Sequence, residues 1–303
     1  MSTNQLENLD YKYPRIGKSK WTLIPICIFL VTLFIYFPIT YKVKSILKKQ
    51  LTSIPGCPLD YKDIKTEFFL PKLIVEDLSI PARCLNLRNS PDLKMKKVFL
   101  HFRGLSFSPF GPHFLLETTI LKNKLSAYIT TGIGGMGISI RENVFDSRVI
   151  NHFVPKFRLS GKIKTDLLVK TNSDGLSDLK LNFRSNDIAI PPQSLQGFKL
   201  STLILNDLLL KAQMKGNKLE VQDLILGDAQ APIRASFNGN IDISPRNFKN
   251  SQLDLKGEVK FSSEFLEKYA IIKLVMGKFD KRDDFYQIAL KGPVTRPTPQ
   301  KAR

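Results

Sequence analysis

The chain opens with one long apolar run. Residues 21–41 hold 21 consecutive positions without a charged side chain. At about 1.5 Å per residue, a helix of this length spans roughly 31 Å, which matches the ~30 Å hydrocarbon core of a bilayer. We therefore predict a polar tail at 1–20, a transmembrane helix at 21–41 and a juxtamembrane helix at 42–55. A cleaved signal peptide is the alternative, but its apolar core is shorter, about 7–15 residues, and no small-residue cleavage site follows here.

From about residue 60 onward the period of the pattern changes from 3.6 to two. In 233–243, Ile233, Ala235 and Phe237 fall on one face, whereas Arg234 and Ser236 fall on the other. Such alternation is typical of strands with one solvated face. Turn signals separate the segments, and the long helical crossovers that parallel strands need are missing. The pattern predicts a mainly β protein, with a curved, mostly antiparallel β-sheet (a half-barrel or groove) over 56–292 and one or two short helices.

Two segments carry helical signals. Residues 263–276 begin with Ser263 as a candidate N-cap and end before Gly277, and Glu264 and Glu267 lie near the positive end of the helix dipole. Residues 141–153 form a weaker candidate. The Pro-rich, basic tail at 293–303 is expected to be disordered.

One local pattern, apolar–any–Gly–any–apolar, recurs four times, and parity places each glycine on the apolar face of its strand. Glycine inside a strand marks a bulge, a bend or a close approach. Two interpretations stay open: ordinary bulges in a sandwich whose apolar faces meet, or an open sheet whose apolar inner face is a groove. The candidate groove-lining residues are Gly161, Ile163, Phe237, Gly239, Ile241, Leu255, Gly257, Val259, Leu290 and Gly292.

Three segments carry a resemblance to known proteins: 218–227 (KLEVQDLILG), 233–243 (IRASFNGNIDI) and 286–297 (YQIALKGPVTRP). They resemble the AsmA-like superfamily. The layout of an N-terminal anchor, a long β-rich region and a terminal strand ending Leu-x-Gly-x-Val-x-x-Pro is similar to that of the general secretion pathway protein N (GspN) family. Residues 60–130 have no recognisable counterpart in that pattern.

The resemblance implies a component of the bacterial type II protein secretion system. Such a protein crosses the inner membrane once, with 1–20 in the cytoplasm and the β-rich domain in the periplasm. It acts through contacts with other secretion-system subunits, with the secretin among the candidates, and has no catalytic residues. The alternative is an AsmA-like lipid-binding or lipid-transfer protein with an apolar β-groove, whose partner is phospholipid.

Charge and cysteine content refine this picture. Lys and Arg number 46 and Asp and Glu 27, giving a net charge of +19. The excess is scattered, which suits anionic headgroups or acidic partners, with general solubility as the alternative, and we expect no nucleic acid partner. Basic residues balance on the two sides of 21–41, so the positive-inside rule gives no orientation. Cys57 and Cys84 would form a disulfide in an exported domain, and two reduced thiols are the alternative.

The remaining motifs predict no chemistry. Residues 132–137 (GIGGMG) match a dinucleotide-binding pattern, but the residues that follow alternate like a strand, so we interpret them as a glycine-rich turn or a curled strand. His101, His113 and His152 are isolated, and we expect no metal, no cofactor and no enzymatic activity. The aromatic group around Phe107, Phe110 and Phe114 is either core or an apolar patch for a lipid or a partner.

Overall fold

The structure is a computed structural model that divides into two units, Met1–Gln50 and Leu51–Arg303. The residues it describes are 57–67, 72–85, 91–107, 109–153, 158–172, 175–195, 198–244 and 250–302, with positions 25, 26, 28, 29, 45, 48 and 49. The predictions for 1–20 and, apart from those positions, for 21–41 and 42–55 lie outside the described residues. Within the described part of the chain, no helix has the length and apolar character that crossing a bilayer requires.

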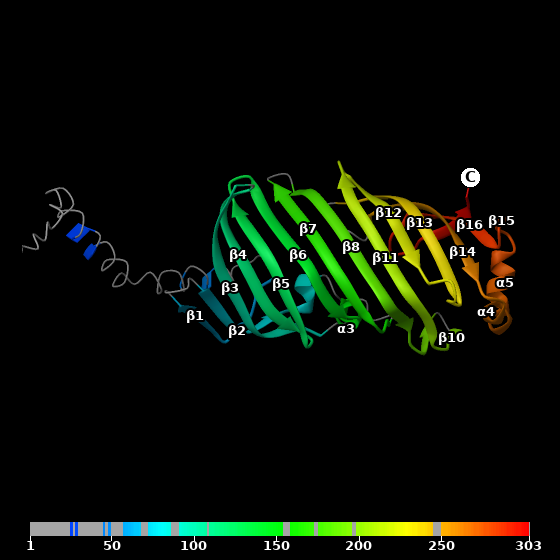
Figure 1. The fold of residues 1–303 in the computed structure, drawn as a ribbon, viewed down its shortest axis with the longest axis horizontal. Helices are drawn as coiled ribbons and strands as arrows, with labels where there is room; N and C mark the ends of the chain where they lie inside the picture. The colour runs from blue at the N-terminus through cyan, green and yellow to red at the C-terminus, as the bar shows by residue number, and fades with distance from the viewer. Residues whose placement is uncertain are drawn as a thin grey trace, which may run out of the picture. The chain divides into compact units, whose positions relative to one another are not determined.

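The second unit is built on one large antiparallel sheet (Figure 1). Strands pair in chain order from β1 to β8, then β8 pairs with β11, and the order continues through β14 to β16. Strands β15 and β17 both pair with β16, and β9 and β10 form a separate hairpin. This arrangement confirms the prediction of a mainly β, antiparallel domain with few helices.

The strands have the following bounds: β1 Asp63–Glu67, β2 Lys72–Ile80, β3 Leu93–Phe107, β4 Phe110–Ile120, β5 Asn123–Gly132, β6 Gly135–Asp146, β7 Lys162–Asn172, β8 Gly175–Ile190, β9 Gln193–Leu195, β10 Phe198–Leu200, β11 Leu203–Lys215, β12 Lys218–Leu226, β13 Ile233–Asp242, β14 Gln252–Phe261, β15 Lys281–Arg282, β16 Phe285–Pro293 and β17 Thr298–Lys301. A short 3-10 helix, η1, covers Ala82–Leu85.

The register separates an apolar face from a polar face. Leu224, Phe237, Gly257 and Ile288 lie opposite one another in a row across β12, β13, β14 and β16. A row on the opposite face, three positions along β13, consists of polar residues, Glu220, Asn240, Asp254 and Lys291. Because side chains alternate across a strand, the alternation in the sequence becomes two chemically different surfaces of the same sheet.

The helix predicted at 263–276 forms as two pieces, α4 (Ser263–Lys268) and α5 (Ala270–Met276). The break lies at Tyr269, whose φ of −123° and ψ of 62° are not helical. The Tyr269 hydroxyl accepts a hydrogen bond from the backbone N–H of Ser201 at 3.0 Å, which fixes the break against the chain before β11. Ser262, and not Ser263, is the N-cap: its side chain accepts from the N–H of Phe265.

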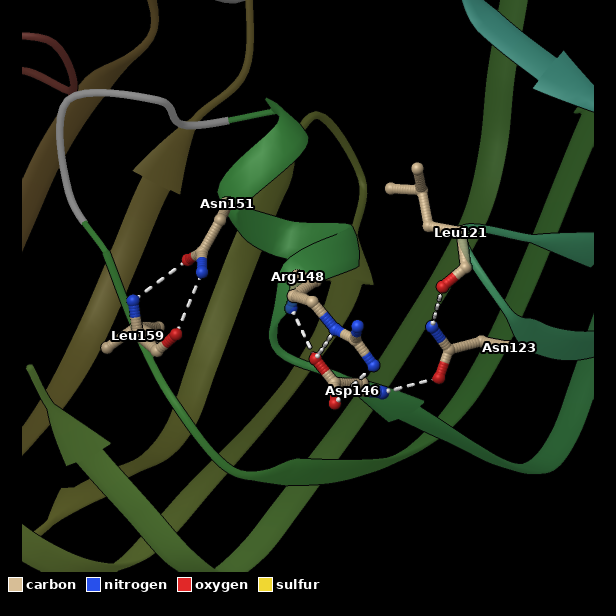
Figure 2. A network of polar contacts seen from close by, with 6 residues as sticks. All are labelled: Leu121, Asn123, Asp146, Arg148, Asn151 and Leu159. Carbon is tan, nitrogen blue, oxygen red and sulfur yellow. Dashed lines mark hydrogen bonds and ion pairs between the residues drawn. The ribbon is translucent and has the colours of Figure 1, made fainter.

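The helix predicted at 141–153 is wrong in its first half, because residues up to Asp146 belong to β6 and only α3 (Arg148–Phe153) is helical. A polar network fixes this transition (Figure 2). The Asp146 carboxylate accepts from the Arg148 backbone N–H at 2.9 Å and from its Nε at 2.8 Å, and the Arg148 side chain holds the pKa of Asp146 below its usual value. Asn151 then pairs with both backbone groups of Leu159 at 2.8 Å.

Two smaller predictions are also resolved by the pairing. Of the two interpretations of the glycine-rich motif, the turn is the one observed: it joins β5 and β6, with Gly132 opposite Gly135. The tail expected to be disordered instead contributes β17, whose residues Thr298–Lys301 pair with β16. Backbone pairing along β16 therefore orders a segment whose composition alone indicated disorder.

Candidate functional site

The apolar face of the sheet carries two clusters of buried side chains. The first joins strands β11 to β16 with helix α5, and Phe279 covers it from beyond the helix; its buried members are Ala212, Leu219, Val221, Phe237, Leu255, Val259, Met276, Phe279 and Ile288. The second joins β7, β8 and β11 with helix α4; its buried members are Ile163, Ile188, Ile190, Leu203, Leu205, Ala231 and Phe265. Helices α4 and α5 thus cover part of the apolar face.

An apolar cavity of about 260 Å³ lies on the same face, and it shares residues with both clusters. Its wall comes from β8, β11, β12 and β13, with one residue from the chain before β7. Every lining side chain is apolar: Leu159, Ile188, Ile190, Leu205, Leu208, Leu224, Leu226, Ala235 and Phe237. Since genuinely apolar cavities do not hold water well, this space suits a hydrocarbon.

The residues predicted to line a groove all lie on or beside this face, but the structure distributes them. Phe237 lines the cavity. Leu255 and Val259 are buried in the first cluster, where Ile241 and Leu290 pack against it, and Ile163 is buried in the second. Phe237 therefore marks the boundary between the packed surface under α5 and the cavity.

The four glycines lie in or directly before strands. Gly257 sits opposite Phe237, and a Cβ atom there would collide with the Phe237 ring and with the backbone of β13. Gly239 has a φ of +141°, a conformation that side chains other than glycine rarely adopt. Gly161 and Gly292 also have positive φ values, 123° and 103°. These glycines permit close approach and irregular backbone, and Phe237 occupies the space that Gly257 leaves open.

Most of the cavity wall was missed by the sequence pattern. Strand β11 contains the leucine-rich run 203–210, but a bulge at Asn206, with a φ of 62°, shifts its register against β8 and interrupts the alternation. Asn206 Nδ2 donates to Asp228 Oδ2 at 2.6 Å, and this hydrogen bond lowers the pKa of Asp228 below its ordinary value. The Asp228 N–H in turn donates to the carbonyl of Leu205 at 3.0 Å, so the bulge holds Leu205 in the wall.

The remaining candidates are placed as follows. Cys57 and Cys84 form a disulfide with a Cα–Cα distance of 5.1 Å. His101 pairs with Glu117 at 3.0 Å, and His113 Nδ1 contacts Thr130 Oγ1 at 2.8 Å. Over the part of the chain that the structure describes, no group of three or more His, Cys, Asp or Glu side chains is placed to hold a metal ion.

The arrangement can enclose an apolar chain, and the cavity wall offers no side chain that could hydrogen-bond to a polar group. Sugars, nucleotides and other polar ligands would lose their hydration there without compensation.

No protein-family model, no curated protein and no solved structure matches this chain.

Proposed function

We propose that this protein binds the acyl chain of a lipid on the apolar face of its sheet. The observation that carries the proposal is the cavity of about 260 Å³ whose wall is entirely apolar. Pockets for small molecules have volumes of roughly 300–1,000 Å³, so this cavity fits part of a hydrocarbon chain and leaves the headgroup outside. Each methylene buried there contributes about 0.8 kcal/mol.

The proposal extends to the shape of the binding surface, a curved sheet that forms a groove. Two strands, β6 and β11, contain register shifts at positions with positive φ, Glu142 and Asn206. Such bulges bend a strand and increase its twist. A sheet that bends around its apolar face can shield a chain longer than the cavity itself.

The setting proposed for this activity is a bacterial envelope, with a single anchor at 21–41 in the inner membrane and the β-rich domain in the periplasm. The Cys57–Cys84 disulfide supports an oxidising compartment, since such bonds are rare in the cytosol. The net charge of +19 supports work beside anionic lipids. The AsmA-like sequence segments support the same setting.

The test is photocross-linking of the full chain in liposomes to a phospholipid whose acyl chain carries a diazirine. Ala235 lines the cavity, and Ala235→Phe fills it; Ser236→Phe places the same ring on the opposite, exposed face of β13 as a matched control. We expect Ala235→Phe to reduce cross-links to cavity residues at least fivefold and Ser236→Phe to leave them unchanged. Equal cross-linking in both variants, with unchanged circular dichroism, would refute the proposal.

A second candidate function rests on the edges of the sheet. Among the described residues, β1 pairs on one side only, with β2, and its other edge is open to an added strand. This observation favours the scaffolding role that the resemblance implies, as an inner-membrane component of a type II secretion system. A photocross-linker at Lys65 in β1 should then form a product with another secretion-system subunit, such as the secretin. Deletion of the gene should stop secretion into the medium; unimpaired secretion would exclude this role.

A further inference from the structure

Two neighbouring hairpins end in exposed apolar side chains. Phe107 is 89% exposed at the β3–β4 tip, and Ile133 is 84% exposed at the β5–β6 tip. Leu105 and Phe110 are also exposed. Exposed apolar patches of this kind mark sites of interaction with proteins, ligands or membranes. We call these four residues the tip patch.

The two hairpin ends form one surface. The Ile133 N–H donates to the carbonyl of Phe110 at 3.1 Å, and Gly111 lies directly against the backbone of Thr131 and Gly132. In Figure 1, the β3–β4 hairpin lies at the same end of the sheet as the last residues of β7, opposite α3. The tip patch therefore spans two adjacent hairpin ends.

Basic side chains predominate around the tip patch. Residues 102–116 and 125–140 contain no Asp or Glu. Arg103 is exposed beside the patch, and Arg141 and Lys170 line a hollow of about 270 Å³ whose wall includes Pro109 of the β3–β4 tip. Asp178 lies opposite Lys170 on β8, but no ion pair joins the two. In the described part of the chain, none of the three cations is engaged in an ion pair, so they are available to anionic headgroups.

The tip patch also continues into the apolar face. Phe102 lies opposite Phe114, with ring centroids 5.8 Å apart in an edge-to-face contact. On the same side of these two strands follow Leu100 opposite Leu116, and then Val98. An apolar path thus leads from the hairpin tips to the surface on which lipid binding is proposed.

We propose that the tip patch inserts into an anionic lipid bilayer, with Arg103, Arg141 and Lys170 at the level of the headgroups. The apolar tips supply the insertion and the cations supply the preference for negative charge. This inference rests on the proposed function in one respect: it gives the apolar face a route by which an acyl chain arrives from a bilayer. Insertion itself is measurable whether or not the cavity holds lipid.

The experiment uses the full chain in liposomes and a single tryptophan as a depth probe. The chain has one tryptophan, so Trp21→Phe gives a clean background, to which Phe107→Trp or Ile133→Trp is added. Leu274→Trp on α5 is the matched control, because Leu274 is 76% exposed and apolar but lies outside the tip patch. Fluorescence is compared between liposomes with and without brominated acyl chains, each containing one-third phosphatidylglycerol.

We expect bromination to quench the tryptophans at 107 and 133 at least twofold and the tryptophan at 274 by less than a fifth. Replacing phosphatidylglycerol by phosphatidylcholine should weaken the quenching at the tips at least twofold. Absence of quenching at both tips, or equal quenching at 274, would overturn the inference. A blue-shifted but unquenched tip would also overturn it, since a protein surface would then cover the patch. If cavity cross-linking persists while the tips stay unquenched, the proposed function stands without this inference.

Discussion

Two adjacent regions of the same apolar face differ in what fills them. Under α5, the side chains of Met276 and Phe279 pack against Leu255, Val259 and Ile288, and the surface is closed. Beside it, strands β8, β11, β12 and β13 present equally apolar side chains, but a space of about 260 Å³ remains.

The difference shows that alternation and burial do not by themselves separate a core from a binding surface. Both regions consist of aliphatic and aromatic residues on one side of regular strands. Phe237 belongs to both, since it is buried in the first cluster and also lines the cavity. Helix cover alone does not decide which part becomes core, because Ile188, Ile190 and Leu205 line the cavity and also belong to the cluster that contains Phe265 of α4. Removing or adding side-chain volume on either side of Phe237 tests where close packing ends.

The largest effect is expected for Phe237→Ala, which enlarges the cavity and opens the packed cluster at once. Loss of a buried aromatic side chain costs about 3–5 kcal/mol of unfolding free energy. The measurement is denaturant unfolding of the full chain in detergent micelles, with Phe110→Ala, at a half-exposed position, as a control expected within about 0.5 kcal/mol. A loss below 1 kcal/mol for Phe237→Ala would mean that the two regions do not depend on each other through this ring.

The second-largest loss of unfolding free energy is expected from overpacking at Gly257. Gly257→Ala drives a methyl group into the Phe237 ring and the β13 backbone, and such overpacking costs about 1–3 kcal/mol. Gly137→Ala is the matched control, because a methyl group there meets only ordinary contacts, with the Pro109 Cδ at 3.8 Å. We expect the control to lie within about 0.5 kcal/mol of the parent chain. Similar losses for both variants would show that Gly257 is not a packing constraint.

A smaller effect separates the filled region from the hollow one directly. Ala212 is 3% exposed in the first cluster, whereas Ala235 borders the cavity. Ala212→Val should cost about 1–2 kcal/mol, because extra methyl groups have no space there. Ala235→Val should be neutral or stabilising by a few tenths of a kcal/mol, since it occupies empty volume and suits a strand. If Ala235→Val lowers the thermal stability more than Ala212→Val does, the free space lies beside Ala212 and not beside Ala235.

The sequence was sufficient for the fold class because antiparallel strands with one solvated face leave a strict two-residue period. It also located the apolar face through residues such as Leu255 and Val259, which are indeed buried. Tertiary contacts decided the rest: the hydrogen bond from Ser201 to Tyr269 accompanies the break between α4 and α5, and pairing with β16 orders β17.

The cavity itself was less accessible to sequence reasoning. The glycine pattern pointed to Gly161 and to β13, β14 and β16, yet Gly257 is filled by Phe237, and most of the cavity wall comes from β8, β11 and β12. The leucines of β11 and β12 carried the signal, but bulges in both strands break the alternation by which it would be recognised. A leucine-rich strand with an internal Asn is a better indicator here than a recurrent glycine.

The smallest expected effect concerns the bulge that supports the cavity wall. The hydrogen bond from Asn206 keeps the pKa of Asp228 below its usual value, so the folded state favours the charged form. The stability contributed in this way is fully present above the unfolded pKa of about 3.9 and is lost as the pH falls through the lower folded value. Between pH 6 and pH 3, the parent chain should therefore lose slightly more thermal stability than Asp228→Asn or Asn206→Ala.

Hydrogen exchange locates this loss. The Asp228 N–H, which donates to Leu205 in the cavity wall, should lose protection at low pH, whereas amides of β14 beneath α5 should keep theirs. Leu205 would then be held by a polar bulge that weakens with acid, in contrast to the helix-covered surface, which depends on apolar contacts alone. Equal loss of protection in β14 would mean that both regions open as one unit and that the cavity has no local stability of its own.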